Sequence, residues 1–179
     1  MANLNLNGNI SKNEETLQLA YSDLITFGKL FSPQDFLASA TPDFHIDVGK
    51  LLTDRSKQQL ALVLPRDHAK STMAACAVLH RFVFATKENP EFIAWIGEAQ
   101  DQARDNLGWI QNHIYENPAI HYYFGDLEGD KWTKDEFTLK NGCRMIGKGT
   151  SQRLRGKKQN STRYTGIILD DFESELNTK

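Results

Sequence analysis

The chain has 179 residues, enough for one core of ordinary size and a small N-terminal appendage. Its composition, 40% hydrophobic and 25% charged, is typical of a globular protein, and its formal net charge of -2 argues against a general polyanion binder. No apolar run approaches the roughly 20 residues that span a bilayer, and the N-terminus lacks the basic and apolar regions of a secretory signal.

Hydrophobic spacing and turn residues predict helices that alternate with strands. In chain order we expect a helix at 12–28, a short helix ending at Ala40, a helix at 46–53, a strand at 60–64, a helix at 70–85, a strand at 92–97 and a helix whose apolar face runs from Ala99 to Ile114. Two strands follow around the hairpin signal Asn141-Gly142, then a polar loop at 147–163 and a buried strand that ends at Asp170. This order predicts an α/β fold for residues 56–179, with a mostly parallel sheet and helices on both faces, after an N-terminal helical segment, residues 1–55.

The segment between the strand at 60–64 and the next helix has the layout of a phosphate-binding loop. The residues expected to contact a nucleotide are Pro65, Arg66, Asp67, His68, Ala69, Lys70, Ser71 and Thr72. Lys70 is expected to reach the β- and γ-phosphates, Ser71 to ligate magnesium, and Arg66 to add a charge beside the γ-phosphate. The standard pattern has Gly where this chain has Pro65 and Ala69, so an ordinary strand-to-helix turn with an exposed lysine is the alternative.

A second pattern, IILDDFESE, occupies residues 167–175. An Asp at the carboxyl end of a buried strand lies where it can hold a magnesium ion, and this position is Asp170. A second carboxylate close behind can orient the attacking water as a general base, and Asp171 and Glu173 compete for this role. The alternative is an acidic helix start after a strand.

Seven basic residues and no acidic ones lie between Arg144 and Arg163. An arginine on this segment, such as Arg155, can stabilise the charge of a transferring phosphate in its own subunit or in a neighbour. The segment can also follow a DNA backbone or bind a partner through Lys148, Arg153, Lys157 and Lys158. The alternative is a solvated basic loop.

The two cysteines, Cys76 and Cys143, are widely spaced in the sequence. We expect two reduced, buried thiols rather than a disulfide. No Cys/His cluster has the spacing of zinc ligands.

The segments PRDHAKST, FIAWIG with EAQDQA, TSQRLRG and ILDDFE occur in this order, and the set resembles large terminase subunits of tailed bacteriophages over about residues 30–175. The resemblance implies a P-loop NTPase fold of the ASCE (RecA-like) class. It implies an ATPase that uses ATP and Mg²⁺ to translocate double-stranded DNA into a procapsid. The implied partners are this DNA, the portal protein and the small terminase subunit, in a homo-oligomeric ring (a pentamer) in the host cell cytoplasm.

Carried across by position, Lys70 and Ser71 resemble the phosphate and magnesium residues of that family, and Arg66 its additional arginine. Asp170 resembles the Walker B metal carboxylate, and Asp171 stands where many members have the catalytic Glu, with Glu173 still open. Arg155, before Gly156, resembles the arginine supplied in trans, although its spacing to Asp170 is longer than usual. The family often has Gly at the position of Asp67.

The chain ends nine residues after Asp170, without the later strands or the nuclease domain of that family. We therefore expect a fragment or a short relative, monomeric when isolated and a weak or inactive ATP hydrolase. Two rival functions remain, a helicase-like nucleic-acid-dependent P-loop ATPase and a non-catalytic module that binds DNA or a partner through residues 144–163.

Overall fold

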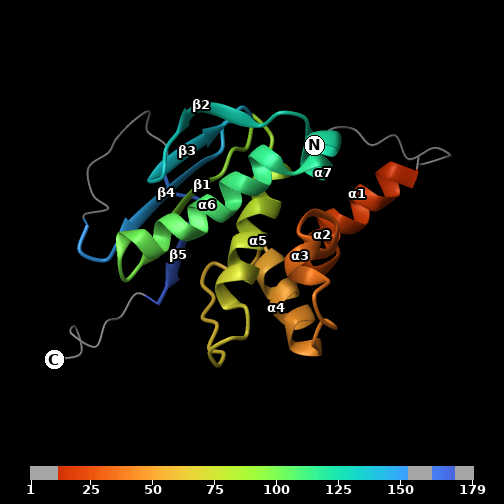
Figure 1. The fold of residues 1–179 in the computed structure, drawn as a ribbon, viewed down its shortest axis with the longest axis horizontal. Helices are drawn as coiled ribbons and strands as arrows, with labels where there is room; N and C mark the ends of the chain where they lie inside the picture. Colours follow the sequence, from red (N-terminus) through yellow and green to blue (C-terminus); the bar gives the residue numbers. More distant parts are fainter. Residues whose placement is uncertain (1–11, 153–162, 172–179) are drawn as a thin grey trace. The chain divides into compact units, whose positions relative to one another are not determined.

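The computed structural model describes residues 12–152 and 163–171, which form two compact units. The described residues up to His80 belong to the first unit, and those from Arg81 onward belong to the second. The first contains helices, and the second contains a five-stranded sheet with helices (Figure 1). The α/β class predicted from the sequence is therefore confirmed, whereas the P-loop NTPase fold stays a prediction.

The helices of the first unit are α1 (Lys12–Ser22), α2 (Leu24–Phe31), α3 (Pro33–Phe36), α4 (Asp43–Thr53) and most of α5 (Lys70–Val83). The single helix predicted at 12–28 is wrong, because Asp23 divides it. Asp23 has extended backbone angles, and its side chain accepts a 2.6 Å hydrogen bond from the Thr26 amide. An aspartate that caps a helix in this way ends the preceding one, since the cap residue itself is not helical.

The core of the first unit is built around α2. Leu24, Phe27 and Phe31 are at most 1% exposed. Gly28 allows α3 to approach closely, because a Cβ atom at this position would lie 2.5 Å from the Phe36 ring. From α5, His80 contacts the Phe27 ring edge-on and donates from Nε2 to the Tyr21 carbonyl at 2.9 Å. The helix α5, which follows the predicted phosphate loop, thus packs into the first unit through His80 near its C-terminal end.

The strand predicted at 60–64 is absent from the structure, and this prediction is wrong. Leu60 is 40% exposed and Val63 is 93% exposed, although both are large and apolar. A strand needs a neighbouring backbone for its hydrogen bonds, and the described part of the first unit is otherwise helical. Apolar composition alone therefore misassigned this segment.

The elements of the second unit are β1 (Phe92–Gly97), α6 (Gln100–Glu116), α7 (Pro118–Phe124), β2 (Glu128–Trp132), β3 (Glu136–Leu139), β4 (Arg144–Gly149) and β5 (Gly166–Asp170). The strand order is β2-β3-β4-β1-β5. β1 pairs in parallel with β4 and β5, whereas β2–β3 and β3–β4 are antiparallel. The sheet is mixed, and the prediction of a mostly parallel sheet is wrong because short turns join β2, β3 and β4, which permits only antiparallel pairing.

The hairpin predicted around Asn141-Gly142 is confirmed between β3 and β4. Gly142 has φ of 88°, which favours glycine, and the Asn141 amide donates to the Phe82 carbonyl at 2.8 Å. The fourth strand continues to Gly149, so the loop expected from residue 147 begins later than predicted.

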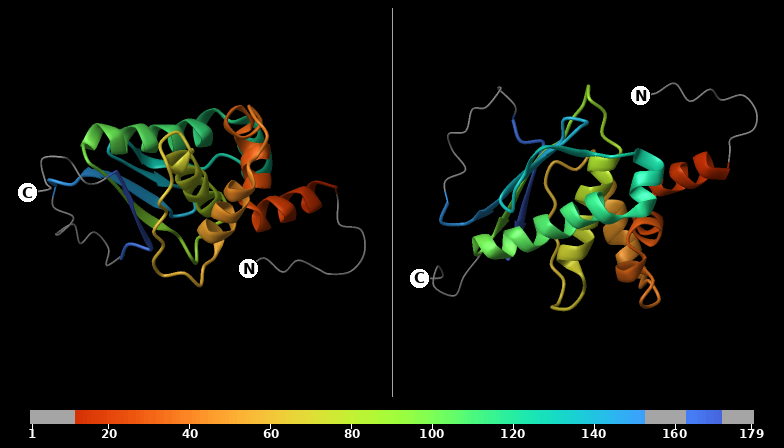
Figure 2. Two further views of the ribbon diagram at one scale, coloured as in Figure 1. Left: turned by 90° about the horizontal axis from the view of Figure 1, so that it is seen from below. Right: turned by 45° about the horizontal axis from the view of Figure 1, so that its top comes forward.

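Helix α6 packs on β1 and β4, as the views in Figure 2 show. Its apolar stripe of Ala103, Leu107, Ile110 and Ile114 is at most 1% exposed, which confirms the helical face read from the sequence. Gly147 lets the helix lie close to β4, since a Cβ there would be 3.2 Å from Leu107 Cδ1. That helices cover both faces of the sheet stays a prediction.

A buried carboxylate joins the start of β1 to the residue before β5. Glu91 accepts hydrogen bonds from Arg81 at 3.2 Å (Nε) and 2.7 Å (Nη2), and also from the Thr165 hydroxyl. The Glu91 amide donates to the Cys143 sulfur at 3.3 Å. These bonds hold β5 in register beside β1 and thereby place Asp170 at the end of the sheet.

Candidate functional site

The loop at residues 65–69 has a backbone that L-amino acids rarely adopt. Asp67 has φ of 63° and Ala69 has φ of 53°, both in the left-handed region. Asp tolerates this region, but for Ala it costs about 1–2 kcal/mol. Turns that include such residues can aim successive amides into one concavity, the form that phosphate loops use. The loop therefore contains two left-handed residues directly before α5, at Asp67 and Ala69.

Lys70 folds back over this loop. Its Nζ donates hydrogen bonds of 2.9 Å to the carbonyl oxygens of both Leu64 and Pro65. Two carbonyls hold the ammonium group inside the turn, at the first residue of α5. An incoming phosphate would compete with these carbonyls for the same cation, and a charged phosphate oxygen is the stronger acceptor.

The first turn of α5 supplies the next part of the site. The Met73 amide donates to the Ala69 carbonyl at 2.8 Å, which closes the first helical turn after the loop. In general, the first amides of an α-helix point out of the helix end rather than to a carbonyl of the same helix. Donors at this position, together with the helix dipole, favour an anion.

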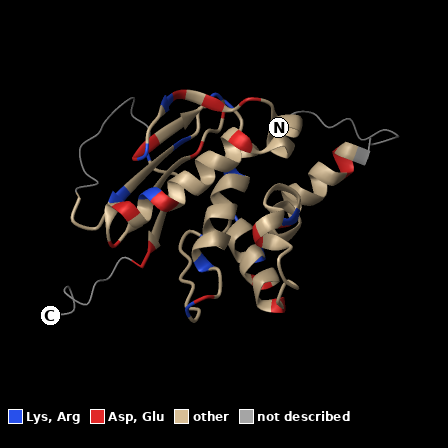
Figure 3. Cartoon of the chain, viewed as in Figure 1, with Lys and Arg blue, Asp and Glu red and all other residues tan. Residues whose placement is uncertain are grey.

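Arg66 and Pro65 lie exposed on the loop, whereas Ser71 and Thr72 are half-buried. Figure 3 shows basic and acidic segments next to each other on this loop. The structure thus groups the eight predicted nucleotide-binding residues in one turn and the helix start that follows it. It also explains Asp67, since this side chain suits a positive φ where the resembled family often has Gly.

His68 makes hydrogen bonds that shape the turn. Its Nδ1 donates to the Arg66 carbonyl at 2.7 Å. The His68 carbonyl accepts a 3.1 Å hydrogen bond from His45 Nε2 on α4. The contact with His45 was not visible in the sequence, because 23 residues separate the two histidines.

The second predicted group, Asp170 and Asp171, lies in the second unit. Gly97 pairs with both Gly149 and Asp170, so the ends of β4, β1 and β5 adjoin. Asp170 is half-buried, and Asp171 is exposed with φ of 43°. The carboxyl ends of parallel strands form the edge where α/β sheets bind ligands. Asp170 is therefore at the edge that the sequence predicted, while the loop at 65–72 belongs to the first unit.

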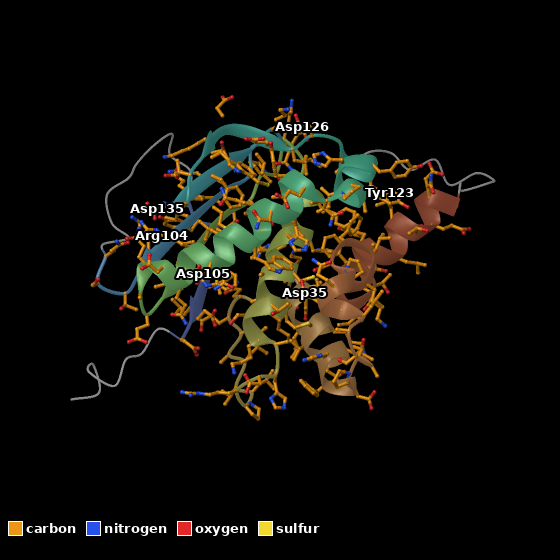
Figure 4. The ribbon with its side chains drawn as sticks, in the orientation of Figure 1. Asp35, Arg104, Asp105, Tyr123, Asp126 and Asp135 are labelled. Carbon is orange, nitrogen blue, oxygen red and sulfur yellow. The ribbon has the colours of Figure 1, made fainter. Side chains whose placement is uncertain are left out.

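A polar network at the same edge was missed by the sequence reading. Arg104 donates to Asp135 from Nε at 2.7 Å and from Nη2 at 3.3 Å, and Figure 4 shows these two side chains together. Gln100 donates to Asp135 at 2.6 Å and accepts a 2.7 Å bond from Gln152. The hydrogen bonds from Arg104 hold the pKa of the Asp135 carboxyl below its usual value. Helix spacing shows that Gln100 and Arg104 share a face, but nothing local identifies Asp135 as their partner.

The start of the basic segment is tied to the end of β1. The Thr150 amide donates to the Gly97 carbonyl at 3.1 Å, and its hydroxyl donates to the Glu98 carbonyl at 3.2 Å. Lys148 lies half-buried on β4. The remaining predicted residues of this segment, Arg153, Arg155, Lys157 and Lys158, lie outside the described residues, as does Glu173.

No group of three or more His, Cys, Asp or Glu side chains suited to a metal ion occurs in residues 12–152 and 163–171. The Ser71 hydroxyl in the first unit and the Asp170 carboxylate in the second are each oxygen donors of the kind that Mg²⁺ prefers. The same ranges contain no helix long and apolar enough to cross a membrane. Both cysteines are free and buried within these ranges, which confirms that prediction.

Comparison of the sequence with models of known protein families, and with curated proteins, finds no match.

Proposed function

We propose that the chain binds a magnesium nucleoside triphosphate through residues 65–72 and is the ATPase part of a DNA-packaging motor, a large terminase subunit. The observation that carries the nucleotide site is the pair of positive φ angles at Asp67 and Ala69, directly before Lys70 and the start of α5. Strained backbone of this kind persists where the surrounding contacts hold it, and it is concentrated at ligand sites. The terminase assignment rests on the order of the sequence segments described above.

In the proposed reaction, Lys70 leaves the carbonyls of Leu64 and Pro65 and contacts the β- and γ-phosphates. The amides at the start of α5 donate to the same phosphates, and Arg66 adds positive charge beside the γ-phosphate. The Ser71 hydroxyl is the proposed ligand of Mg²⁺, which neutralises phosphate charge in this chemistry, and Asp170 is the metal carboxylate that the resemblance implies.

The chemical step is hydrolysis of the γ-phosphoryl group. A carboxylate, Asp171 or Glu173, accepts a proton from water as the water oxygen bonds to the γ-phosphorus. The bond from that phosphorus to the bridging oxygen breaks, which yields ADP and inorganic phosphate. Arg155 stabilises the transition-state charge, from its own subunit or from a neighbour in a ring.

The proposed work of this cycle is translocation of double-stranded DNA, with a portal protein and a small terminase subunit as further partners. The basic residues Lys148, Arg153, Lys157 and Lys158 are the proposed contacts to DNA or to a partner. A helicase-like P-loop ATPase would share the nucleotide site, so DNA-stimulated hydrolysis without strand separation supports the packaging function over it.

The nucleotide site is tested by titrating the chain with ATP and Mg²⁺ in a calorimeter. We expect Lys70→Ala to weaken binding about ten- to a hundred-fold, because it removes hydrogen bonds to a charged group. Lys50→Ala is the matched control, since Lys50 lies in the same unit with its side chain 70% exposed. Absence of magnesium-dependent binding, or equal binding by the wild type and Lys70→Ala, would refute the site and leave the non-catalytic binding module.

The catalytic roles are separated by measuring phosphate release. Asp170→Asn is expected to abolish hydrolysis. Loss of activity in Asp171→Asn with activity retained in Glu173→Gln assigns the base to Asp171, and the reverse result assigns it to Glu173. For Arg155→Ala, an equal loss in dilute monomer and in assembled ring excludes a role in trans.

A further inference from the structure

We infer that His45, on α4, is a positioning residue of the phosphate loop: it holds the His68 carbonyl so that Ala69 keeps its positive φ before a nucleotide arrives. This role rests on the proposed function of residues 65–72. No sequence pattern had connected α4 with residues 65–72.

The contacts between α4 and the loop are specific. His45 Nε2 lies 3.1 Å from the His68 carbonyl oxygen, and because a carbonyl only accepts, the imidazole must carry its proton on Nε2. The neighbouring Phe44 ring contacts both histidine rings, with centroid distances of 4.3 Å to His45 and 5.6 Å to His68. The first turn of α4 thus contacts both the backbone and the side chain of His68.

The hydrogen bond fixes the direction of a backbone amide. A trans peptide is planar, and its C=O and N–H point in opposite directions. When His45 holds the His68 carbonyl toward α4, the Ala69 N–H of the same peptide must point away from α4. No peptide bond in the described residues is cis, so this holds at the loop. His45 therefore sets the direction of an amide immediately before Lys70.

A second argument comes from Lys70. In the structure its ammonium group donates hydrogen bonds to the carbonyl oxygens of Leu64 and Pro65. In the proposed function it gives up these two bonds and contacts phosphate instead. The loop then loses two of its internal hydrogen bonds. The bond from His45 does not involve Lys70 and can persist through this exchange, so it can hold Ala69 in place while the nucleotide is bound.

The test uses the whole chain and two variants. His45→Leu removes the donor at similar size, and His45→Gln keeps an N–H donor near the position of Nε2. His121→Leu is the matched control, because His121 Nε2 makes an equivalent 2.8 Å bond to the Tyr115 carbonyl in the second unit. Amide hydrogen exchange over residues 62–73 is measured by mass spectrometry without nucleotide, and affinity is measured with ATP and Mg²⁺.

We expect His45→Leu to speed exchange in this segment about five-fold and to weaken ATP binding by a similar factor, the effect of one hydrogen bond. His45→Gln should restore both values, and His121→Leu should change neither. Unchanged exchange in His45→Leu, or faster exchange with unchanged affinity, overturns the inference. A loss in His45→Leu that His45→Gln does not restore also overturns it, since packing rather than the donor would then be responsible. Failure of the wild type to bind ATP refutes the proposed function instead, and with it the positioning role.

Discussion

The left-handed backbone at Ala69 predicts that a substitution by glycine, which usually lowers the stability of a protein, raises it at this position. Ala69→Gly should stabilise the chain, because φ of 53° suits glycine better than alanine. Ala74→Gly, five residues later in the middle of α5, is the matched control. The two variants lose the same methyl group, and both positions lie in the first unit, but we expect opposite effects.

The magnitudes follow from backbone conformation. Relief of the left-handed strain at Ala69 is worth about 1–2 kcal/mol. Glycine also gives the unfolded chain more freedom, which costs about 0.4–1 kcal/mol. The remainder stabilises Ala69→Gly by about 0.8 kcal/mol. In helix α5 no strain is relieved, and Ala74→Gly should cost about 0.5–1 kcal/mol.

The assay is urea unfolding of the full chain, followed by circular dichroism of its helices at 222 nm. A difference of about 1.5 kcal/mol between the variants separates their midpoints by about 1 M urea if the slope is about 1.5 kcal/mol per M. ATP affinity of Ala69→Gly should stay at or above that of the wild type. If Ala69→Gly lowers the midpoint as much as Ala74→Gly does, the loop does not hold Ala69 at positive φ in solution, and the observation that carries the nucleotide site fails.

Three further predictions concern the rest of the molecule. Glu91→Ala should cost the second unit about 3 kcal/mol, because it leaves the half-buried Arg81 guanidinium without its carboxylate partner, whereas the exposed Glu88→Ala should leave the stability nearly unchanged. Fluorescence of the three tryptophans, all in the second unit, measures both. The pKa of Asp135 is lowered in the folded state, so its stabilisation is present above the ordinary value of 3.8 and is lost as the pH falls through the lowered value. The melting temperatures of wild type and Asp135→Asn should therefore differ at pH 7 and converge below that range, and a constant difference contradicts this. Burial raises the pKa of Cys76 and raises that of Cys143 to about 11, so neither should react with iodoacetamide at pH 8 until urea is added, and rapid native labelling in a mass spectrum would contradict it.

Sequence patterns predicted the structure well where all the residues responsible are close together in the chain, and poorly where the result depends on a distant segment. The stripe of α6 and the turn at Gly142 were predictable, because the residues responsible lie within a few positions of one another. The break at Asp23 carried a local signal as well, since an aspartate before an apolar helical stretch is a frequent cap. The helix α7 begins at Pro118 with Asn117 as its cap, and both are recognisable start signals, but no helix was expected there.

The prediction of a strand at 60–64 failed for a different reason. Its five apolar residues satisfy the composition of a buried strand, but a strand exists only where another backbone accepts its hydrogen bonds. The type of sheet could not be predicted either, because it depends on how β2, β3 and β4 pair. The strand β2 was not recognised because its residues are mostly polar. For the site, residue types identified the loop at 65–72 and Asp170, while the partners His45 and Asp135 came from distant parts of the chain.

Several chemical groups of this protein were predictable from residues close together in the chain: a lysine and hydroxyl residues at a helix start, a carboxylate at a strand end, and an apolar face on α6. These features depend on neighbours along the chain, and local conformation suffices to place them. By contrast, the positive φ angles of Asp67 and Ala69 and the hydrogen bond from α4 to the His68 carbonyl became visible in the folded structure alone. An alanine does not choose a left-handed conformation on its own, because that conformation costs it energy, and the contacts that hold it come from residues far away in the sequence.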